Sequence, residues 1–196
     1  MIASLPDEIV RAVRLTLVFA VFTGLVYGLV LTGVFQLVFP SQANGSLITQ
    51  NGQVVGSQLI GQQFTSDRYF HGRYSATSTP YAADNSAGSN LGPNNKALID
   101  RVASSARTIR QENGLAANAQ VPVDLVTADF SGFDPDVTEA SALLQVDRVA
   151  KARGLDAARV HALVEEYVQG RILWVFGEPH VNVLQLNMAL DAGEAG

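Results

Sequence analysis

The hydrophobic pattern is dominated by one segment near the N-terminus. Residues 15–39 carry no charged side chain, and sixteen of these twenty-five positions are Leu, Val or Phe. As an α-helix this segment is about 37 Å long, which exceeds the hydrocarbon core of a bilayer, about 30 Å. The pattern predicts a transmembrane helix over residues 15–39, preceded by a short segment, residues 1–14, and followed by a domain over residues 40–196.

The charges beside this span predict its orientation. Arg11 and Arg14 precede it, and the next Lys or Arg in the chain is Arg68. The positive-inside rule therefore places the N-terminus in the cytoplasm and the following domain on the outer side of the membrane. A cleaved signal peptide is the alternative, because residues 41–43 resemble a cleavage site. However, the apolar region of a signal peptide has only about 7–15 residues, so we expect a retained anchor.

Small residues recur at every fourth position within the span. Spacing of this kind lines one helix face and allows a second helix to approach closely. Glycine is also common in membrane helices without such a role, and both interpretations stay open. Gln36 continues the series, and its amide favours a hydrogen bond to another helix. The candidate contact residues are Gly24 and Gly28, within the series Thr16, Ala20, Gly24, Gly28 and Thr32.

After the span, short apolar stretches alternate with turn and capping residues, a pattern typical of a small α+β domain. Apolar pairs on both sides of Asn51-Gly52 predict a β-hairpin. Periodicity and capping residues predict helices over residues 93–114, 138–154, 156–170 and 184–190. Apolar runs predict strands over residues 121–126, 172–176 and 181–183. The expected fold is a single N-terminal transmembrane helix followed by one small α+β extracytoplasmic domain.

Residues 61–93 have little periodicity but contain five aromatic side chains. Irregular segments of this length inside a compact domain are usually functional or disordered, and the aromatic content argues against a disordered linker. We therefore expect a surface loop that binds another protein. Aromatic residues and arginine are enriched at the energetic centres of interfaces, so the candidate contacts are Tyr69, Phe70, His71 and Arg73.

Composition excludes several classes of function. The formal net charge is −5 without a basic cluster, which argues against binding nucleic acid. The chain has no cysteine, so disulfides and thiolate metal sites are excluded. The three histidines lack metal-ligand spacing, and no phosphate-binding glycine loop is present. We therefore assign no catalytic residue, metal ligand or bound cofactor.

One acidic cluster, Asp129, Asp134, Asp136 and Glu139, leaves alternatives open. Several carboxylates in a loop suit a hard cation, although the same residues also favour a turn and the start of a helix. An anchored extracytoplasmic enzyme using this cluster is therefore an alternative function. A solute-sensing domain that uses residues 69–81 is another.

Seven sequence blocks in order resemble one known family. They are residues 42–47, 56–62, 69–73, 88–94, 122–128, 145–153 and 177–187, and they follow the single N-terminal span. Over nearly its whole length the chain is similar to the C subunit of the Kdp-type potassium-transporting P-type ATPase of bacteria and archaea.

The resemblance implies a non-catalytic accessory subunit of an ATP-driven, high-affinity potassium uptake complex in the cell inner membrane, with its domain in the periplasm. Its implied partners are a channel-like potassium-translocating subunit, a P-type ATP-hydrolysing subunit and, in many complexes, a small single-helix subunit, besides membrane lipid. The complex uses ATP, Mg and K+. This subunit is implied to support assembly and to raise the ATP affinity of the hydrolytic subunit as a catalytic chaperone. A nucleotide role has been attached to the block that contains Gln145.

Overall fold

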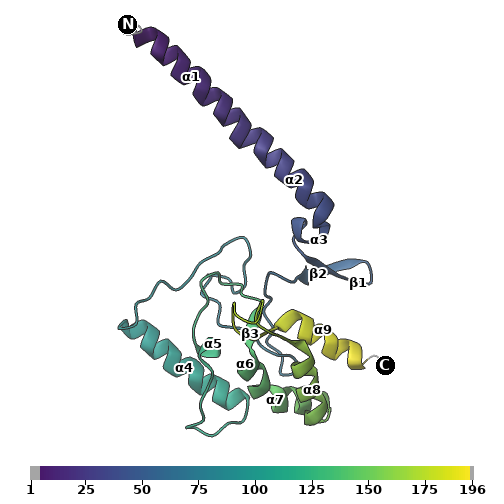
Figure 1. Ribbon diagram of the computed structural model, residues 1–196. Coiled ribbons are helices and arrows are strands. Elements are labelled where there is room, and N and C mark those ends of the chain that lie inside the picture. Colours follow the sequence, from purple (N-terminus) through teal and green to yellow (C-terminus); the bar gives the residue numbers. More distant parts are fainter. Residues whose placement is uncertain (1–4, 195–196) are drawn as a thin grey trace. The chain divides into compact units, whose positions relative to one another are not determined.

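The computed structural model describes residues 5–194, and the chain divides into two units, residues 1–47 and 48–196. In the first unit, α1 (Leu5–Val21), a π-helical turn η1 (Phe22–Val26) and α2 (Tyr27–Val38) follow each other without a break (Figure 1). This 34-residue helix is long and apolar enough to cross a membrane, which confirms the predicted span. The helix begins ten residues before Leu15. The part of the predicted N-terminal segment that precedes Leu5 lies outside the described residues.

The helix ends where backbone geometry and Pro40 stop it. Phe39 has a non-helical φ of −133°, and Pro40 then opens the short helix α3 (Pro40–Ala43). Gln36 pairs with Asn44, each amide donating to the other over 3.2 and 3.0 Å. The hydrogen bond that we expected Gln36 to make with another helix is therefore met here within the unit itself.

A predicted hairpin follows. It consists of β1 (Leu47–Gln50) and β2 (Gln53–Ser57), joined by Asn51-Gly52, whose φ angles are +52° and +79°. Asn and Gly adopt this left-handed conformation at low cost, which explains why the dipeptide identified the hairpin from sequence.

Helices of the second unit form where capping residues and periodicity predicted them. Asn95, Thr138 and Asp156 each accept a hydrogen bond from a backbone N–H of the first turn, as good N-caps do. The second predicted helix is interrupted at Gln145 and the last one is longer than expected. The helices are α4 (Lys96–Glu112), α6 (Glu139–Leu144), α7 (Val146–Arg153), α8 (Ala157–Tyr167) and α9 (Val183–Glu194).

A small antiparallel sheet has the order β3-β5-β4, from β3 (Asp136–Thr138), β5 (His180–Asn182) and β4 (Val168–Gln169). The strand expected at residues 181–183 is therefore found, shifted by one residue. Two predicted strands were wrong. Residues 123–126 form the short helix α5 (Val123–Val126), which follows Pro122 at the N-cap position, and its Asp124 carboxylate accepts from the Thr138 backbone N–H. Residues 172–176 form the turn at the tip of the β4–β5 hairpin.

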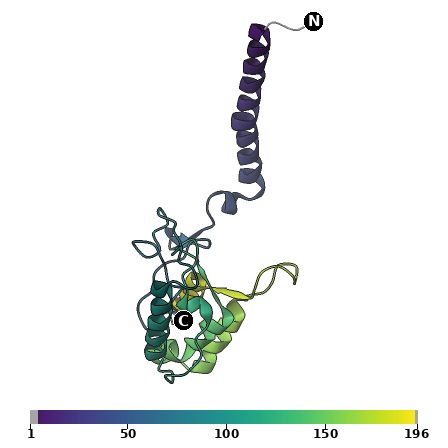
Figure 2. The same cartoon turned by 90° about the vertical axis from the view of Figure 1, so that its left-hand side faces the viewer.

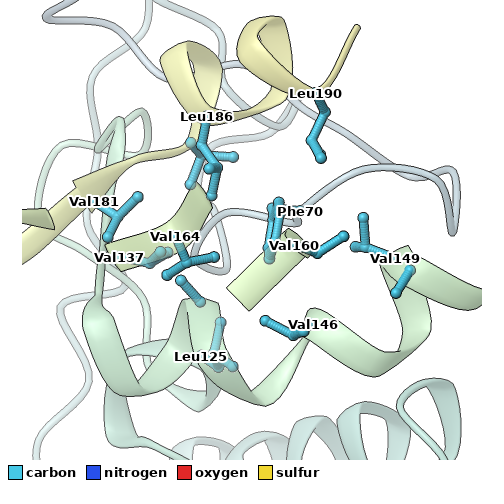
Figure 3. Packing of buried hydrophobic residues seen from close by; sticks show 13 residues of the cluster. Phe70, Leu125, Val137, Val146, Val149, Val160, Val164, Val181, Leu186 and Leu190 are labelled. Atoms are coloured by element: carbon cyan, nitrogen blue, oxygen red, sulfur yellow. The ribbon is translucent and has the colours of Figure 1, made fainter. Parts of the chain in front are cut away.

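The core lies between the sheet, α6–α9 and an inserted loop residue. Phe70 is fully buried among Val149, Val160 and Leu186 (Figure 3). Val164 and Val181 contribute from α8 and β5. Because Phe70 belongs to the irregular segment over residues 61–93, this segment is part of the folded core and not an appendage to it.

Candidate functional site

The segment over residues 61–93 has no helix or strand of its own, yet it is hydrogen-bonded to residues 131–133 along much of its length. The Gly61 N–H donates to the Phe133 carbonyl over 2.8 Å, and the Ala87 N–H to the Ser131 carbonyl over 3.1 Å. Between them, the Ser75 hydroxyl donates to the Gly132 carbonyl over 2.6 Å. These bonds hold the loop, and the candidate contact residues with it, against the domain.

At the centre of the loop, two side-chain amides hold two consecutive residues. The Asn187 amide of α9 accepts from the Phe70 N–H over 2.8 Å and donates to the Phe70 carbonyl over 3.0 Å. Likewise, the Gln145 amide accepts from the His71 N–H over 2.8 Å and donates to the His71 carbonyl over 3.1 Å. Each amide thus replaces the partner that a neighbouring β-strand would provide.

Gln145 has no hydrogen-bonding capacity left over. Its oxygen also accepts from the Arg148 guanidinium over 2.7 Å, and its nitrogen also donates to the Ser141 carbonyl over 3.1 Å. A glutamine amide has two donors and two acceptor positions, and all four are used here inside the protein. The side chain is also almost completely buried.

Arg148 of α7 fixes the preceding part of the loop. Its guanidinium donates to the carbonyls of Asp67 and Tyr69 over 2.8 and 3.0 Å, and to the Asn113 side chain over 3.0 Å. Burial lowers the pKa of Arg148, but an arginine remains charged. The structure therefore places this residue at the junction of the loop, α4 and α7.

Tyr69 is packed against α7 and α9. The Arg153 guanidinium lies 4.8 Å from the centre of the Tyr69 ring and donates to Asp191 over 2.8 Å. The Tyr69 hydroxyl donates to the same carboxylate over 3.1 Å, and Phe64 contacts the ring from the loop side. Tyr69 therefore belongs to a local cluster of aromatic and charged groups and remains only half-buried.

Arg73 lies further along the loop, in an ion pair with Asp134. The two side chains are 2.9 Å apart, and both are about one-quarter exposed. The Tyr81 hydroxyl donates to the Arg73 carbonyl over 2.7 Å. Burial raises the pKa of Tyr81, so this hydroxyl remains a donor at all ordinary pH values.

His71 and Arg73 line an open hollow of about 340 Å³ between the loop and α4. The opposite wall carries Thr108 and Glu112 of α4. Burial, and next the positive charge of Arg148, lower the pKa of His71 below its ordinary value. His71 is therefore neutral at neutral pH. The hollow offers a half-buried imidazole, a cation and small hydroxyl groups, a surface suited to contact with polar groups of another protein.

Three residues of the acidic cluster, Asp129, Asp134 and Asp136, are engaged by other groups of the domain. The Asp129 carboxylate accepts from the backbone N–H groups of Gly132 and Asp134, each over 2.6 Å. Asp134 pairs with Arg73, and Asp136 accepts from Asn182. Burial raises the pKa of Asp136 above its ordinary value. Among the described residues, no group of three or more His, Asp or Glu side chains has the geometry of a metal site.

Gly24 and Gly28 lie in the membrane-spanning helix, on either side of the end of the π-helical turn. A Cβ atom at either glycine would meet no other part of the chain within 4 Å. The nearby Thr23 and Thr32 hydroxyls donate to carbonyls one turn earlier, over 2.6 and 2.9 Å, which satisfies them in lipid. In an α-helix of 3.6 residues per turn, positions four apart shift gradually around the helix. A π-helical turn contains more residues per turn and rotates less per residue, so it partly cancels this shift and keeps the small residues closer to one face.

The candidate residues thus fall into three separate sets. Tyr69, His71 and Arg73 are partly exposed along the loop, whereas Phe70 is buried beneath them. Gln145 supports the loop from below, and the two glycines belong to the span. Sequence reasoning missed Asn187 and the role of Arg148. The sequence signal that could have identified both residues is a polar side chain on the helix face that is otherwise apolar and faces the core.

Comparison with known proteins identifies the family. A family model described as K+-transporting ATPase, c chain (KdpC), matches residues 9–192. The KdpC subunit of a potassium-transporting ATPase from Rhodopseudomonas palustris (strain BisB18) is 53% identical over 199 residues, covering 95% of this chain and 98% of the relative. Those of Bradyrhizobium diazoefficiens and Burkholderia orbicola are 51% and 54% identical, covering 96% and 93% of this chain and 98% and 95% of the relatives. The chain therefore belongs to the KdpC family, the c chains of K+-transporting ATPases.

Proposed function

We propose that this chain is a non-catalytic accessory subunit of an ATP-driven, high-affinity potassium uptake complex. The observation that carries the proposal is the family match over residues 9–192, which includes the apolar span as well as the domain. The chain acts in assembly and stabilisation of the complex and has no active site of its own. The engagement of Asp129 with backbone N–H groups supports this, because the enzyme alternative depended on that acidic turn.

Its partners in this proposal are the channel-like potassium-translocating subunit, the P-type ATP-hydrolysing subunit and the small single-helix subunit. The chain crosses the inner membrane once. Arg11 and Arg14 before the span favour a cytoplasmic N-terminus and a periplasmic domain. The channel-like subunit is then the natural contact of the domain, since ATP hydrolysis takes place on the other side of the membrane.

Two surfaces support the interaction. In the span, Gly24 and Gly28 leave room for a partner helix. In the domain, we assign contact to Tyr69, His71 and Arg73, whose side chains are partly exposed. Phe70 acts from beneath, by fixing the loop in the core.

An effect on ATP affinity must be indirect if the domain is periplasmic. If the domain binds one conformation of the complex more tightly than another, it changes the affinity of the distant nucleotide site by coupling between the two sites, without direct contact. All hydrogen-bonding positions of the Gln145 amide are used within the domain, so its part in this effect is to hold His71 in place and not to contact nucleotide.

Copurification tests the proposal. The tagged full chain, extracted from its native membrane in mild detergent, should bring down two larger membrane polypeptides, one of which hydrolyses ATP in a potassium-stimulated manner. Replacing both Gly24 and Gly28 by Leu should reduce their recovery. A chain that always runs alone would refute the subunit assignment.

A matched pair of variants tests the loop surface. Arg73→Ala removes both the ion pair and a partly exposed cation, whereas Asp134→Asn breaks the same ion pair and leaves Arg73 in place. We expect Arg73→Ala to lower recovery of the partners and Asp134→Asn to leave it nearly unchanged. Equal losses would assign Arg73 a purely structural role.

A further inference from the structure

The tip of the β4–β5 hairpin exposes five consecutive large apolar side chains. Each is between 63% and 90% exposed, and Trp174 is the most exposed of them. Figure 2 shows this hairpin, coloured yellow-green, standing away from the rest of the domain. Contiguous exposed apolar residues of this kind mark interaction sites in soluble domains. The five residues are Ile172, Leu173, Trp174, Val175 and Phe176.

The turn at this tip uses residues that are poorly suited to its backbone. Leu173 and Trp174 have φ angles of +52° and +61°. The other hairpin of the domain places Asn51 and Gly52 at nearly the same angles. Bulky residues in the left-handed region are strained, and Asn-Gly is the preferred choice for such a turn. The tip thus carries apolar side chains despite a conformational cost, which points to a function for them.

Four of the five backbone N–H groups of the tip are already hydrogen-bonded. The N–H groups of Ile172, Trp174, Val175 and Phe176 donate to carbonyls of residues 171–176, over 2.9 to 3.2 Å. Peptide groups that are already hydrogen-bonded lose little when water is removed. At the neck of the hairpin, Arg171 and Glu178 form an ion pair of 2.7 Å. Charge is therefore confined to the neck and paired there.

A bilayer fits these features better than a protein surface does. A protein partner covers one side of such a turn, whereas all five side chains of this turn are apolar and more than 60% exposed, as expected for a tip surrounded by acyl chains. Trp prefers the boundary between headgroups and hydrocarbon. The domain also stays within reach of the membrane, since only nine residues, at most about 35 Å of chain, separate Val38 from Ile48.

We propose that the hairpin tip, residues 172–176, inserts into the headgroup–acyl boundary of the leaflet on the side of the membrane where the domain lies. The tip then forms a second membrane contact of the chain, besides the span. The paired Arg171 and Glu178 lie among the headgroups. This inference depends neither on which side of the membrane that is nor on the presence of other subunits.

Trp174 is the only tryptophan of the chain and therefore reports on the tip directly. The full chain is reconstituted into vesicles of phosphatidylcholine and phosphatidylglycerol, and tryptophan emission is measured. We expect emission at short wavelength, strong quenching by lipids brominated near the top of the acyl chain, and loss of quenching by aqueous acrylamide.

Two variants complete the test. Trp174→Phe combined with Phe130→Trp moves the reporter to another highly exposed position of the domain, and quenching there should come from acrylamide alone. Leu173→Asn combined with Phe176→Thr keeps Trp174, suits the left-handed backbone and removes apolar area. This variant should unfold at an equal or higher temperature, yet regain acrylamide quenching. If the unaltered chain is quenched by acrylamide as strongly as the Phe130 reporter, and not by brominated lipid, the proposal is overturned and the tip is left to a protein partner.

Discussion

Replacing Gln145 by Met is the most direct test of how the loop over residues 61–93 is held. Met has nearly the shape of Gln but no amide, so the substitution leaves the packing in place and removes four hydrogen bonds together. The His71 N–H and carbonyl lose their partner, and the Arg148 guanidinium loses one of its acceptors.

The expected loss follows from the two backbone groups of His71. A buried donor or acceptor left without a partner costs about 1–3 kcal/mol, so the two groups together cost about 2–6 kcal/mol. Whole domains are stable by only about 5–15 kcal/mol. The variant should therefore unfold at a much lower denaturant concentration. If Gln145 served as a nucleotide contact and nothing else, the free energy of unfolding would not change.

The assay is urea unfolding of the full chain in mild detergent, followed by far-UV circular dichroism. The membrane-spanning helix resists urea in detergent and contributes a constant background, so the transition reports on the domain. Gln111→Met is the matched control, because Gln111 is exposed on α4 and has no role in the loop. A shift below about 0.5 kcal/mol, the range typical of surface substitutions, would refute the reasoning.

Two further predictions concern the same loop. Phe70→Ala should lower the free energy of unfolding by about 3–5 kcal/mol, because it empties a fully buried aromatic site, and the same urea titration measures this. Lowering the pH should destabilise the domain through His71: its folded pKa lies below the ordinary 6.5, so the unfolded chain takes up the proton first and stability falls as pH drops below about 6.5. Melting temperatures between pH 7.5 and 5.5 should show the decline in the unaltered chain and in His161→Gln, but a smaller decline in His71→Gln. Identical slopes in all three proteins would rule out this source.

The helices could be predicted because their signals are local. Asn95, Thr138 and Asp156 cap helices within two or three residues of their own position, and the apolar face repeats within each segment. The span and the Asn51-Gly52 hairpin are local in the same sense. Residues 123–126 failed as a strand because the deciding contact, from Asp124 to Thr138, joins positions fourteen residues apart.

The candidate site could be predicted only in outline. Sequence marked residues 69–73 by composition, but composition does not show which side chain faces inward. Phe70 has the same hydrophobic character as an interface residue, and it is the distant Asn187 and Gln145 that orient its backbone and that of its neighbour. The exposed tip was missed because an apolar run such as residues 172–176 is typical of a buried strand, whereas here the run is exposed.

Support for the loop has a consequence for binding. A flexible loop must lose conformational entropy when it docks, at a cost of about 1–2 kcal/mol for each backbone residue fixed. Gln145 and Asn187 fix Phe70 and His71 before any partner arrives, so this cost is met during folding. Gln145→Met should then weaken recovery of the membrane partners even though Gln145 is buried and does not reach them. An exposed contact such as Arg73 should instead affect recovery without a matching loss of domain stability, and this difference separates the residues that present the surface from those that form it.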